Sequence, residues 1–292
     1  MARHLPTRLV TVAILDAISV MAWLTVNSMT SAASASPRPN AQSAGDLSDK
    51  GRHRPVTMFV AGDSTASLWP ADTAPKAGWG QGLSAFLDKV KVDDRALSGA
   101  SSKSFIDVGR LDGILADIKP GDYLLISFGH NDSKTDDRFT DPATTYPEYL
   151  TRYIEGARQR HARPILVTSV ERRRFTAEGQ AKRSLGDYPQ AMRDLGAKLH
   201  VPVVDLTEMS LALWQQLGVE GTKTCFLWLD HGAHPNWPNG VQDNTHFQAH
   251  GAIEVARLVV RDLVRQRLVP RHTVKNLAKA VPDSALTWPA TI

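Results

Sequence analysis

The stretch Val56-Thr57-Met58-Phe59-Val60-Ala61-Gly62-Asp63-Ser64-Thr65 joins an apolar, strand-like run to a short polar segment. A continuous apolar run without alternation is typical of a buried strand in a parallel sheet. Polar residues that directly follow such a strand lie at the sheet edge where open α/β folds gather their functional groups. Ser64 is therefore a candidate reactive residue, although Gly-Asp-Ser is also ordinary turn chemistry, in which Asp and Ser bond to nearby backbone.

Strand-like and helix-like segments alternate along the rest of the chain. Strands are predicted at 57–61, 123–128, 164–169 and 202–206, with a more polar fifth at 90–97. Helices are predicted at 80–88, 105–118, 146–162, 188–199 and 253–268. This alternation implies right-handed crossovers, so the predicted fold is α/β, a three-layer α/β/α sandwich with a mostly parallel central sheet. The last ~20 residues are predicted to form a loosely ordered tail.

The first 35 residues have the pattern of a secretory signal peptide. Two arginines precede an apolar stretch at 9–26, and a run of small residues follows, with Ala33-Ser34-Ala35 as the predicted cleavage site. The alternative is a retained membrane anchor, but an acid such as Asp16 in the middle of a spanning helix costs ~2.5–3.5 kcal/mol. We therefore expect a secreted or periplasmic protein that leaves the membrane when the signal peptide is cleaved.

The remaining chain divides into a linker and one domain. Residues 36–55 are rich in Pro, Ser and charged residues and contain almost nothing apolar, so a disordered linker is predicted. Residues 56–292 have the length of a single domain with a substantial core. The net charge of +4 is unevenly spread: residues 1–55 carry +3 and residues 261–292 carry +4, which leaves −3 on the body between them. That body has no interleaved basic and aromatic stripe, so we expect no nucleic-acid partner.

Cys225 is the one cysteine of the chain, so no disulfide can form within it. It lies in an apolar run and is expected to be a small buried hydrophobic residue rather than a reactive thiol. The sequence contains no nucleotide-binding fingerprint, and no cofactor is predicted. A serine is therefore the best candidate for a reactive atom.

Polar residues at other predicted strand ends supply what a reactive serine needs. A serine hydroxyl is a weak nucleophile until a base removes its proton. Asp243 and His246 are three residues apart just before the final predicted helix, so one short turn there would present a carboxylate-oriented imidazole. Taken singly, Asp243 could also be a helix cap and His246 a residue that bonds locally.

An ester-cleaving serine also needs donors for the oxyanion of its tetrahedral intermediate. Gly99 offers a backbone N–H that no side chain blocks, and Asn131 offers a side-chain amide. Ser64 adds its own N–H, which we place at a helix N-terminus where the dipole favours negative charge. The alternatives are a simple turn glycine and an Asx turn.

Together these segments resemble the four sequence blocks of the SGNH (GDSL-type) hydrolase superfamily. The blocks are Gly-Asp-Ser at 62–64, Gly99, Gly-His-Asn-Asp at 129–132 and Asp-x-x-His at 243–246, in the order of that superfamily. Within it the chain is similar to the rhamnogalacturonan acetylesterases of carbohydrate esterase family 12, also through the segment 168–175. The resemblance implies a flavodoxin-like fold, and it implies the catalytic set Ser64, Asp243 and His246 with oxyanion donors Ser64, Gly99 and Asn131.

The resemblance also implies an activity and a partner. The expected reaction is removal of O-acetyl groups from acetylated rhamnogalacturonan or another plant cell-wall polysaccharide through an acyl-enzyme, without metal or other cofactor. The alternatives are a general GDSL-type lipase or esterase, another carbohydrate acetylesterase, and a non-catalytic exported glycan-binding protein. Two positions depart from the family pattern: Ala100 replaces a frequent arginine, and Ser169 stands where proline is common. The oligomeric state is not predicted.

Two further segments admit other interpretations. The histidines at 231, 234, 246 and 250, with Asp230 and Asp243 nearby, superficially resemble a set of metal ligands. In the same region Trp228 and Trp237 suggest a loop over the cleft, where aromatic rings either stack on sugars or pack in the protein. The basic run 172–174 at a predicted strand end either contacts an anionic sugar or forms a solvated loop, which we favour.

Overall fold

The computed structural model describes residues 54–291 of the 292-residue chain. The predicted signal peptide and nearly all of the predicted linker lie outside these residues. Within 54–291, no helix combines the length and apolarity needed to cross a membrane.

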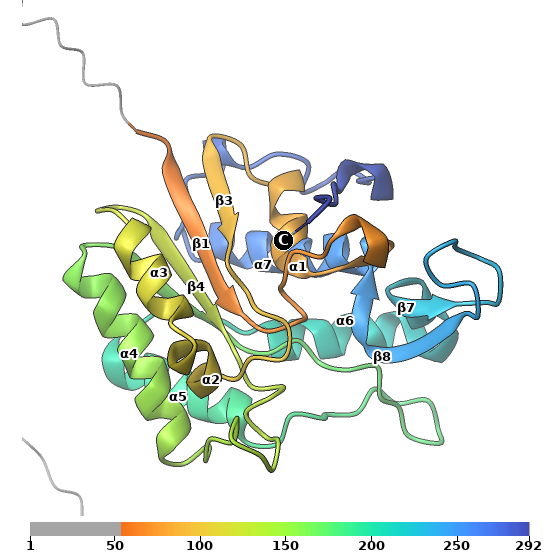
Figure 1. Ribbon diagram of the computed structural model, residues 1–292, viewed down its shortest axis with the longest axis horizontal. Coiled ribbons are helices and arrows are strands. Elements are labelled where there is room, and N and C mark those ends of the chain that lie inside the picture. The colour runs from red at the N-terminus through yellow and green to blue at the C-terminus, as the bar shows by residue number, and fades with distance from the viewer. Residues whose placement is uncertain (1–53, 292) are drawn as a thin grey trace, which may run out of the picture. The chain divides into compact units, whose positions relative to one another are not determined.

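A five-stranded parallel sheet forms the centre of the domain (Figure 1). Its strands lie in the order β3, β1, β4, β5, β6, with bounds Val90–Asp94, Val56–Gly62, Tyr123–Ser127, Arg163–Val167 and Val203–Val204. All neighbouring pairs are parallel, as predicted. β6 is shorter than the strand predicted at 202–206, because a helix, α6 (Leu206–Gly221), begins at the last residue of that segment.

Helices cover both faces of this sheet, which confirms the three-layer sandwich. Successive strand residues point to opposite faces, so Met58 and Val60 of β1 enter one core, while Phe59 and Ala61 enter the other. The first core is closed by α1 (Trp79–Gly82), α6 and α7 (Ala249–Arg265). The second is closed by α2 (Ser102–Asp107), α3 (Arg110–Asp117), α4 (Thr145–Gln159) and α5 (Tyr188–Leu199).

The helices differ from prediction at several ends. The segment predicted as one helix at 105–118 is two helices, α2 and α3, because the chain turns at Gly109 with a φ of 75° that favours glycine. The segment at 80–88 forms only α1 and a short 3₁₀ turn. The final helix, α7, begins at Ala249, before its predicted start.

A second, antiparallel sheet was not predicted. It consists of β2 (Lys76–Ala77), β8 (Val241–Gln248) and β7 (Phe226–Leu229), in that order. In Figure 1, β7 and β8 lie to one side of the central sheet. This small sheet matters because β8 carries Asp243 and His246.

The C-terminal segment packs against the domain, so the prediction of a loosely ordered tail was wrong. Leu286 is buried and belongs to the first core. The Trp288 indole N–H donates to the Lys76 carbonyl at 2.8 Å, and the Gln81 side chain donates to the Thr287 carbonyl at 2.7 Å. These contacts join residues more than 200 positions apart.

Candidate active site

The carboxyl ends of three neighbouring strands bring predicted site residues to one edge of the sheet. The chain runs from β1 to β3 on one side and then crosses back to β4 on the other. Such a reversal opens a crevice at the carboxyl ends of the strands, where α/β proteins bind ligands. Ser64 follows β1, Gly99 follows β3 and Asn131 follows β4, so all three lie on adjacent loops.

Ser64, His246 and Asp243 form a continuous hydrogen-bonded chain. His246 Nε2 is 2.9 Å from Ser64 Oγ, and His246 Nδ1 is 2.7 Å from Asp243 Oδ2. Because a carboxylate only accepts hydrogen bonds, Nδ1 carries a proton, and in the neutral ring Nε2 is left to accept the hydroxyl proton. The structure thus assembles the three residues that the sequence singled out, across 182 positions of the chain.

The electrostatics keep Asp243 ionised. Partial burial raises the pKa of this carboxyl, but hydrogen bonds from the His246 ring and from the N–H groups of Thr245 and His246 outweigh it and bring the pKa to about 2. The His246 side chain keeps 23% of its surface exposed, so a ligand can reach it. The negative charge beside Nδ1 favours the imidazolium that forms when His246 takes a proton.

An irregularity in β8 presents Asp243 and His246 together. Phe226 of β7 pairs with Phe247 and Trp228 pairs with Gln242, so two steps along β7 correspond to five along β8. Within this bulge, Asp243 Oδ1 accepts the N–H groups of Thr245 at 2.7 Å and His246 at 3.0 Å. The prediction of a short turn before the final helix was therefore wrong, because this segment is a bulged strand. The bulge still places the Asp243 and His246 side chains in contact.

The loop after β1 holds Ser64 in a turn rather than at a helix. Asp63 Oδ1 accepts the Thr65 N–H at 2.9 Å and its hydroxyl at 2.8 Å, while the Asp63 carbonyl accepts the N–H of Ala66. The next α-helix, α1, begins at Trp79. The prediction that the Ser64 N–H lies at a helix N-terminus was wrong, so no helix dipole acts on it.

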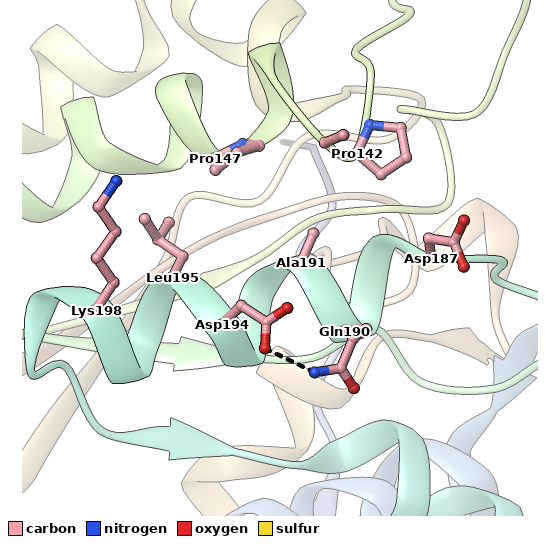
Figure 2. Close-up of a pocket in the computed structure, with 9 residues that line it drawn as sticks. Pro142, Pro147, Asp187, Gln190, Ala191, Asp194, Leu195 and Lys198 are labelled. Atoms are coloured by element: carbon pink, nitrogen blue, oxygen red, sulfur yellow. Dashed lines mark hydrogen bonds between the residues drawn. The ribbon is translucent and has the colours of Figure 1, made fainter.

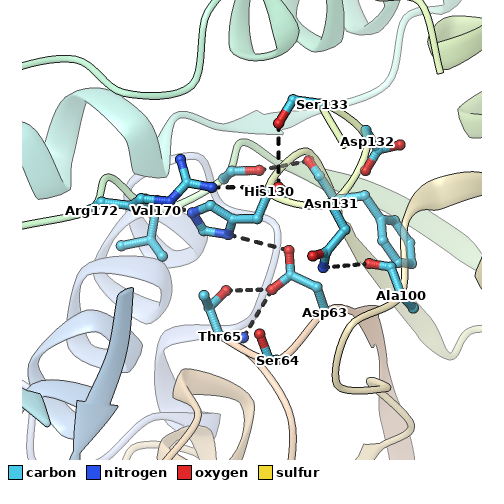
Figure 3. Close-up of polar contacts among 12 residues, drawn as sticks. Asp63, Ser64, Thr65, Ala100, His130, Asn131, Asp132, Ser133, Val170 and Arg172 are labelled. Carbon is cyan, nitrogen blue, oxygen red and sulfur yellow. Dashed lines mark hydrogen bonds and ion pairs between the residues drawn. The ribbon is translucent and has the colours of Figure 1, made fainter. Parts of the chain in front are cut away.

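Asp63, which closes this turn, also forms a buried pair with His130. Asp63 Oδ2 faces His130 Nδ1 at 3.3 Å, and His130 Nε2 donates to the Val170 carbonyl at 2.9 Å (Figure 3). Burial raises the pKa of Asp63, but the charge and hydrogen bond of His130, with those of Thr65, outweigh it and lower the pKa below its usual value. The two ring nitrogens of His130 thus join the Asp63 carboxylate to the Val170 carbonyl. This pair was not predicted from the sequence, because its members lie 67 positions apart.

Three donors for an oxyanion lie on the adjacent loops. Among residues 54–291, the N–H groups of Ser64 and Gly99 have no acceptor. Gly99 has a φ of 80°, a conformation that favours glycine. The Asn131 side-chain nitrogen donates one hydrogen to the Ala100 carbonyl at 2.9 Å, which orients the amide and leaves its second hydrogen free.

The neighbouring Asp132 ties two of these loops together. Its Oδ1 accepts the Ser102 N–H at 3.0 Å, the Ser102 hydroxyl at 2.5 Å and the Thr140 hydroxyl at 2.9 Å. Burial raises the pKa of Asp132 to about 6 despite these bonds. This carboxylate therefore fixes the loop after β4 against α2, and with it Asn131.

A cation does lie near Gly99, although Ala100 replaces the frequent arginine of the family. The Arg138 guanidinium is 3.4 Å from the Gly99 carbonyl oxygen. Its charge is already paired with Asp136, at 2.6 Å between Nη2 and Oδ2. Nothing in the structure explains why serine stands at 169 in place of proline, although its hydroxyl donates to the Phe128 carbonyl.

The metal-ligand interpretation finds no geometric support in the described part of the chain. In residues 54–291, no three His, Cys, Asp or Glu side chains come together so that they could hold a metal ion. His246 instead bonds to Asp243 and Ser64, and His250 faces Asp283 at 4.0 Å. Cys225 is buried, and burial raises the pKa of its thiol to about 11, as expected for a packing residue.

The two tryptophans form contacts within the protein. The Trp228 indole donates to Asn244 at 3.1 Å and carries the Arg173 guanidinium over its ring at 4.5 Å. The Trp237 indole donates to the carbonyls of residues 73 and 74. The Trp69 ring packs edge-on against the His246 ring, with 5.9 Å between the ring centroids, and Trp69 was not singled out by sequence.

One cavity lies away from the candidate site residues. A pocket of about 390 Å³ is formed by Pro142 and Pro147 near the start of α4 and by residues of α5, including Asp194 and Lys198 (Figure 2). None of the predicted site residues lines it. Its walls hold no serine or histidine, so we do not assign the chemistry to it.

The comparisons with known proteins agree with this geometry. Residues 60–238 match the model of the GDSL-like Lipase/Acylhydrolase family. The chain belongs to this family of hydrolases. Three of the four sequence blocks, at 62–64, 99 and 129–132, lie within the matched residues.

Two relatives in Bacillus subtilis (strain 168) cover most of the domain. The chain is 46% identical over 211 residues to rhamnogalacturonan acetylesterase RhgT, covering 72% of this chain and 90% of RhgT. It is 38% identical over 209 residues to probable rhamnogalacturonan acetylesterase YesY, covering 70% and 91%. The crystal structure of YxiM from Bacillus subtilis superposes with a TM-score of 0.64 at 30% identity, over 74% of this chain and 58% of YxiM. The predicted fold is confirmed.

Proposed function

We propose that this protein is a serine esterase that removes acetyl groups from acetylated rhamnogalacturonan, with Ser64 as nucleophile. The observation that carries the proposal is the chain from Ser64 Oγ through the His246 ring to Asp243, with contacts of 2.9 and 2.7 Å. The substrate follows from the two relatives named as rhamnogalacturonan acetylesterases, one of them at 46% identity. Those relatives also disfavour the general lipase that the sequence left as an alternative.

In the first half of the reaction, Ser64 Oγ attacks the acetyl carbonyl carbon while His246 Nε2 takes the hydroxyl proton. The carbonyl oxygen becomes an oxyanion, which the N–H groups of Ser64 and Gly99 and the Asn131 amide stabilise. When the tetrahedral intermediate collapses, the bond to the sugar oxygen breaks. His246 returns its proton to that oxygen, so the sugar leaves as an alcohol and acetyl-Ser64 remains.

In the second half, water takes the place of the sugar. His246 Nε2 removes a proton from the water as it attacks the acetyl carbon, and the same donors stabilise the second oxyanion. Collapse breaks the bond to Ser64 Oγ, which recovers its proton from His246. Asp243 stays ionised throughout and stabilises the imidazolium in both halves.

The experiment combines two variants with a substrate panel. We expect Ser64→Ala and His246→Ala each to lower the hydrolysis of an aryl acetate by at least ~10³, because neither can form the acyl-enzyme efficiently. Circular dichroism should show that both variants remain folded. Acetate release should be faster from acetylated rhamnogalacturonan than from acetylxylan, and esters of long acyl chains should be poor substrates. Full activity in Ser64→Ala would end the proposal, and a preference for long acyl chains would favour the lipase alternative.

We also propose that the protein is exported. The support is the order of positive, apolar and small residues in the first 35 positions, a pattern typical of signal peptides. Mass spectrometry of the protein from the producing cells should find an N-terminus close to residue 36 outside the cytoplasm. An intact N-terminus in the membrane fraction would support the retained anchor instead.

A further inference from the structure

A basic groove lies beside the candidate active site. It is a cavity of about 310 Å³, a size at the lower end of ligand pockets. Ser184 and four cationic residues line it: Arg172, Arg174, Lys182 and Arg183. Two chain segments form it and pair with each other, through the Lys182 N–H on the Arg174 carbonyl at 2.8 Å and an isolated bridge between Phe175 and Ala181. We call this cavity the basic groove.

Two of the four cations already have partners. Arg183 forms a two-pronged ion pair with Glu208. The Arg172 guanidinium donates to the carbonyls of Ser184 and His130, and it is partly buried among them. These two side chains therefore build the walls of the groove.

The other two cations are available to a ligand. Arg174 and Lys182 are both exposed. Within residues 54–291, neither side chain forms an ion pair or a side-chain hydrogen bond. Two uncompensated positive charges face the same cavity, and such a site attracts anions.

The groove is connected to the residues that flank Ser64. Arg172 Nη2 is 3.4 Å from the carbonyl oxygen of His130, the residue before Asn131, and Figure 3 shows the guanidinium directed at it. The Arg173 N–H donates to the Asn244 carbonyl at 2.8 Å, within the bulge that carries Asp243 and His246. The basic run 172–174 thus contacts both the loop that carries Asn131 and the strand β8 that carries His246.

Arg173 anchors this run in place. It is buried, donates to the Thr222 hydroxyl and the Val219 carbonyl, and lies over the Trp228 ring. The sequence-based preference for a solvated loop is therefore wrong for Arg173, whereas the Arg174 side chain is exposed. The contacts of Arg172 and Arg173 fix the backbone at these two residues. The exposed Arg174 therefore follows a segment whose position is fixed.

We propose that the basic groove binds the carboxylate of a uronic acid residue in the substrate polysaccharide. A sugar next to this residue in the same polymer would then lie at Ser64 and lose its acetyl group. The inference rests on the proposed function, in which the substrate is an acidic polysaccharide. A guanidinium binds a carboxylate through two parallel N–H donors, and a lysine ammonium adds a point charge. The groove would supply a cationic contact that Ala100, in place of the frequent arginine of the family, does not offer.

The first test compares an acidic with a neutral polymer. In the double variant Arg174→Gln/Lys182→Gln, the ratio of kcat/KM for acetylated rhamnogalacturonan to that for acetylxylan should fall about five- to tenfold, mainly through a higher KM. The difference from wild type should shrink at high salt, because salt screens exposed charges. The matched control Arg110→Gln/Lys119→Gln removes two exposed charges from the region of α3. An unchanged ratio, or an equal fall in the control, would overturn the proposal.

The second test separates the groove from the esterase reaction. Calorimetry should show that unacetylated rhamnogalacturonan oligosaccharides bind wild type about five- to tenfold more tightly than the double variant. If this difference is found but wild type releases no acetate from the acetylated polymer, the groove stands and the proposed substrate fails. If wild type deacetylates the polymer but binds these oligosaccharides no better than the double variant does, the groove is wrong and the proposed function stands.

Discussion

The carboxyl group of Asp94, at the end of β3, allows a quantitative prediction about stability. Its Oδ1 accepts the Ala96 N–H at 3.0 Å, whereas its Oδ2 is buried with no hydrogen-bond partner. Burial raises the pKa of Asp94 to about 8. The hydrogen bond from the Ala96 N–H lowers this pKa, and the negative charge of Asp93 raises it further. At neutral pH the native protein therefore holds a proton that the unfolded chain, with a carboxyl pKa near 3.8, has lost.

The sign and size of the effect follow from proton linkage. Because the native state binds the proton more tightly, the free energy of unfolding from this group is highest below the unfolded pKa and falls as pH rises towards the native pKa. Between pH 5 and pH 7 the loss is ~1.4 kcal/mol per pH unit, or ~3 kcal/mol in total. Asparagine has nearly the same shape and does not titrate, so Asp94→Asn removes the decline.

Urea unfolding at pH 5, 6, 7, 8 and 9 tests this reasoning. The difference in unfolding free energy between Asp94→Asn and wild type should grow by ~1.4 kcal/mol per pH unit between pH 5 and 7, and it should level off above pH 8. The control Asp112→Asn changes an exposed carboxyl on α3 and should follow wild type at each pH. A difference for Asp94→Asn that stays flat from pH 5 to 8 would refute the assignment of a protonated Asp94.

Three other substitutions test the site and its scaffold. Asn131→Ala should lower kcat for an aryl acetate by ~10²–10³ with a smaller change in KM, since it removes one oxyanion donor. A large rise in KM together with a lower melting temperature would indicate a structural role instead. Asp243→Asn should lower kcat by ~10³–10⁴ because an amide does not hold the Nδ1–H tautomer or stabilise the imidazolium, and near-normal kcat would contradict the role of Asp243. Gly78→Ala should destabilise the fold by ~3 kcal/mol in urea unfolding, because its Cβ would overlap the backbone of Ala66 and Ser67 beneath the Ser64 turn. The control Gly113→Ala, in α3 with no atom near its Cβ, should gain ~0.5–1 kcal/mol; similar effects at the two glycines would contradict the steric argument.

The sequence was sufficient for the central sheet and for the identity of the candidate triad. Continuous apolar runs are a strong signal for buried parallel strands, and β1, β4 and β5 lie where such runs predicted them. The more polar β3 also lies within its predicted segment. The three-residue spacing of Asp243 and His246 allows contact in a turn or in a bulge, so the pair was identified although the local structure was not.

The second sheet could not be predicted, because its strands are defined by their partners. β2 has two residues, and β8 is largely polar, with no alternation that would indicate a strand. Its pairing with β7, which contains the buried Phe226, makes it one. The same holds for the C-terminal segment, whose order depends on contacts such as that of Trp288 with Lys76.

The contacts that hold the Ser64 turn could not be predicted from the sequence either. Gly-Asp-Ser after a strand suggested a helix start, but the Asp63 carboxylate closes a turn and pairs with His130, 67 positions away. Trp69 was overlooked because a single tryptophan in a loop has no periodicity, yet it contacts the His246 ring. Local patterns identify reacting groups, whereas their neighbours follow from the tertiary structure.

The most direct test of the central claim is to detect the acyl-enzyme at Ser64. Wild-type protein mixed with excess aryl acetate and quenched in acid within the first turnovers should carry one acetyl group, which peptide mapping by mass spectrometry should place on Ser64. Ser64→Ala should carry none and release no acetate above background. Acetate release at the wild-type rate from Ser64→Ala, or an acetyl group on another residue of the wild-type enzyme, would contradict the mechanism.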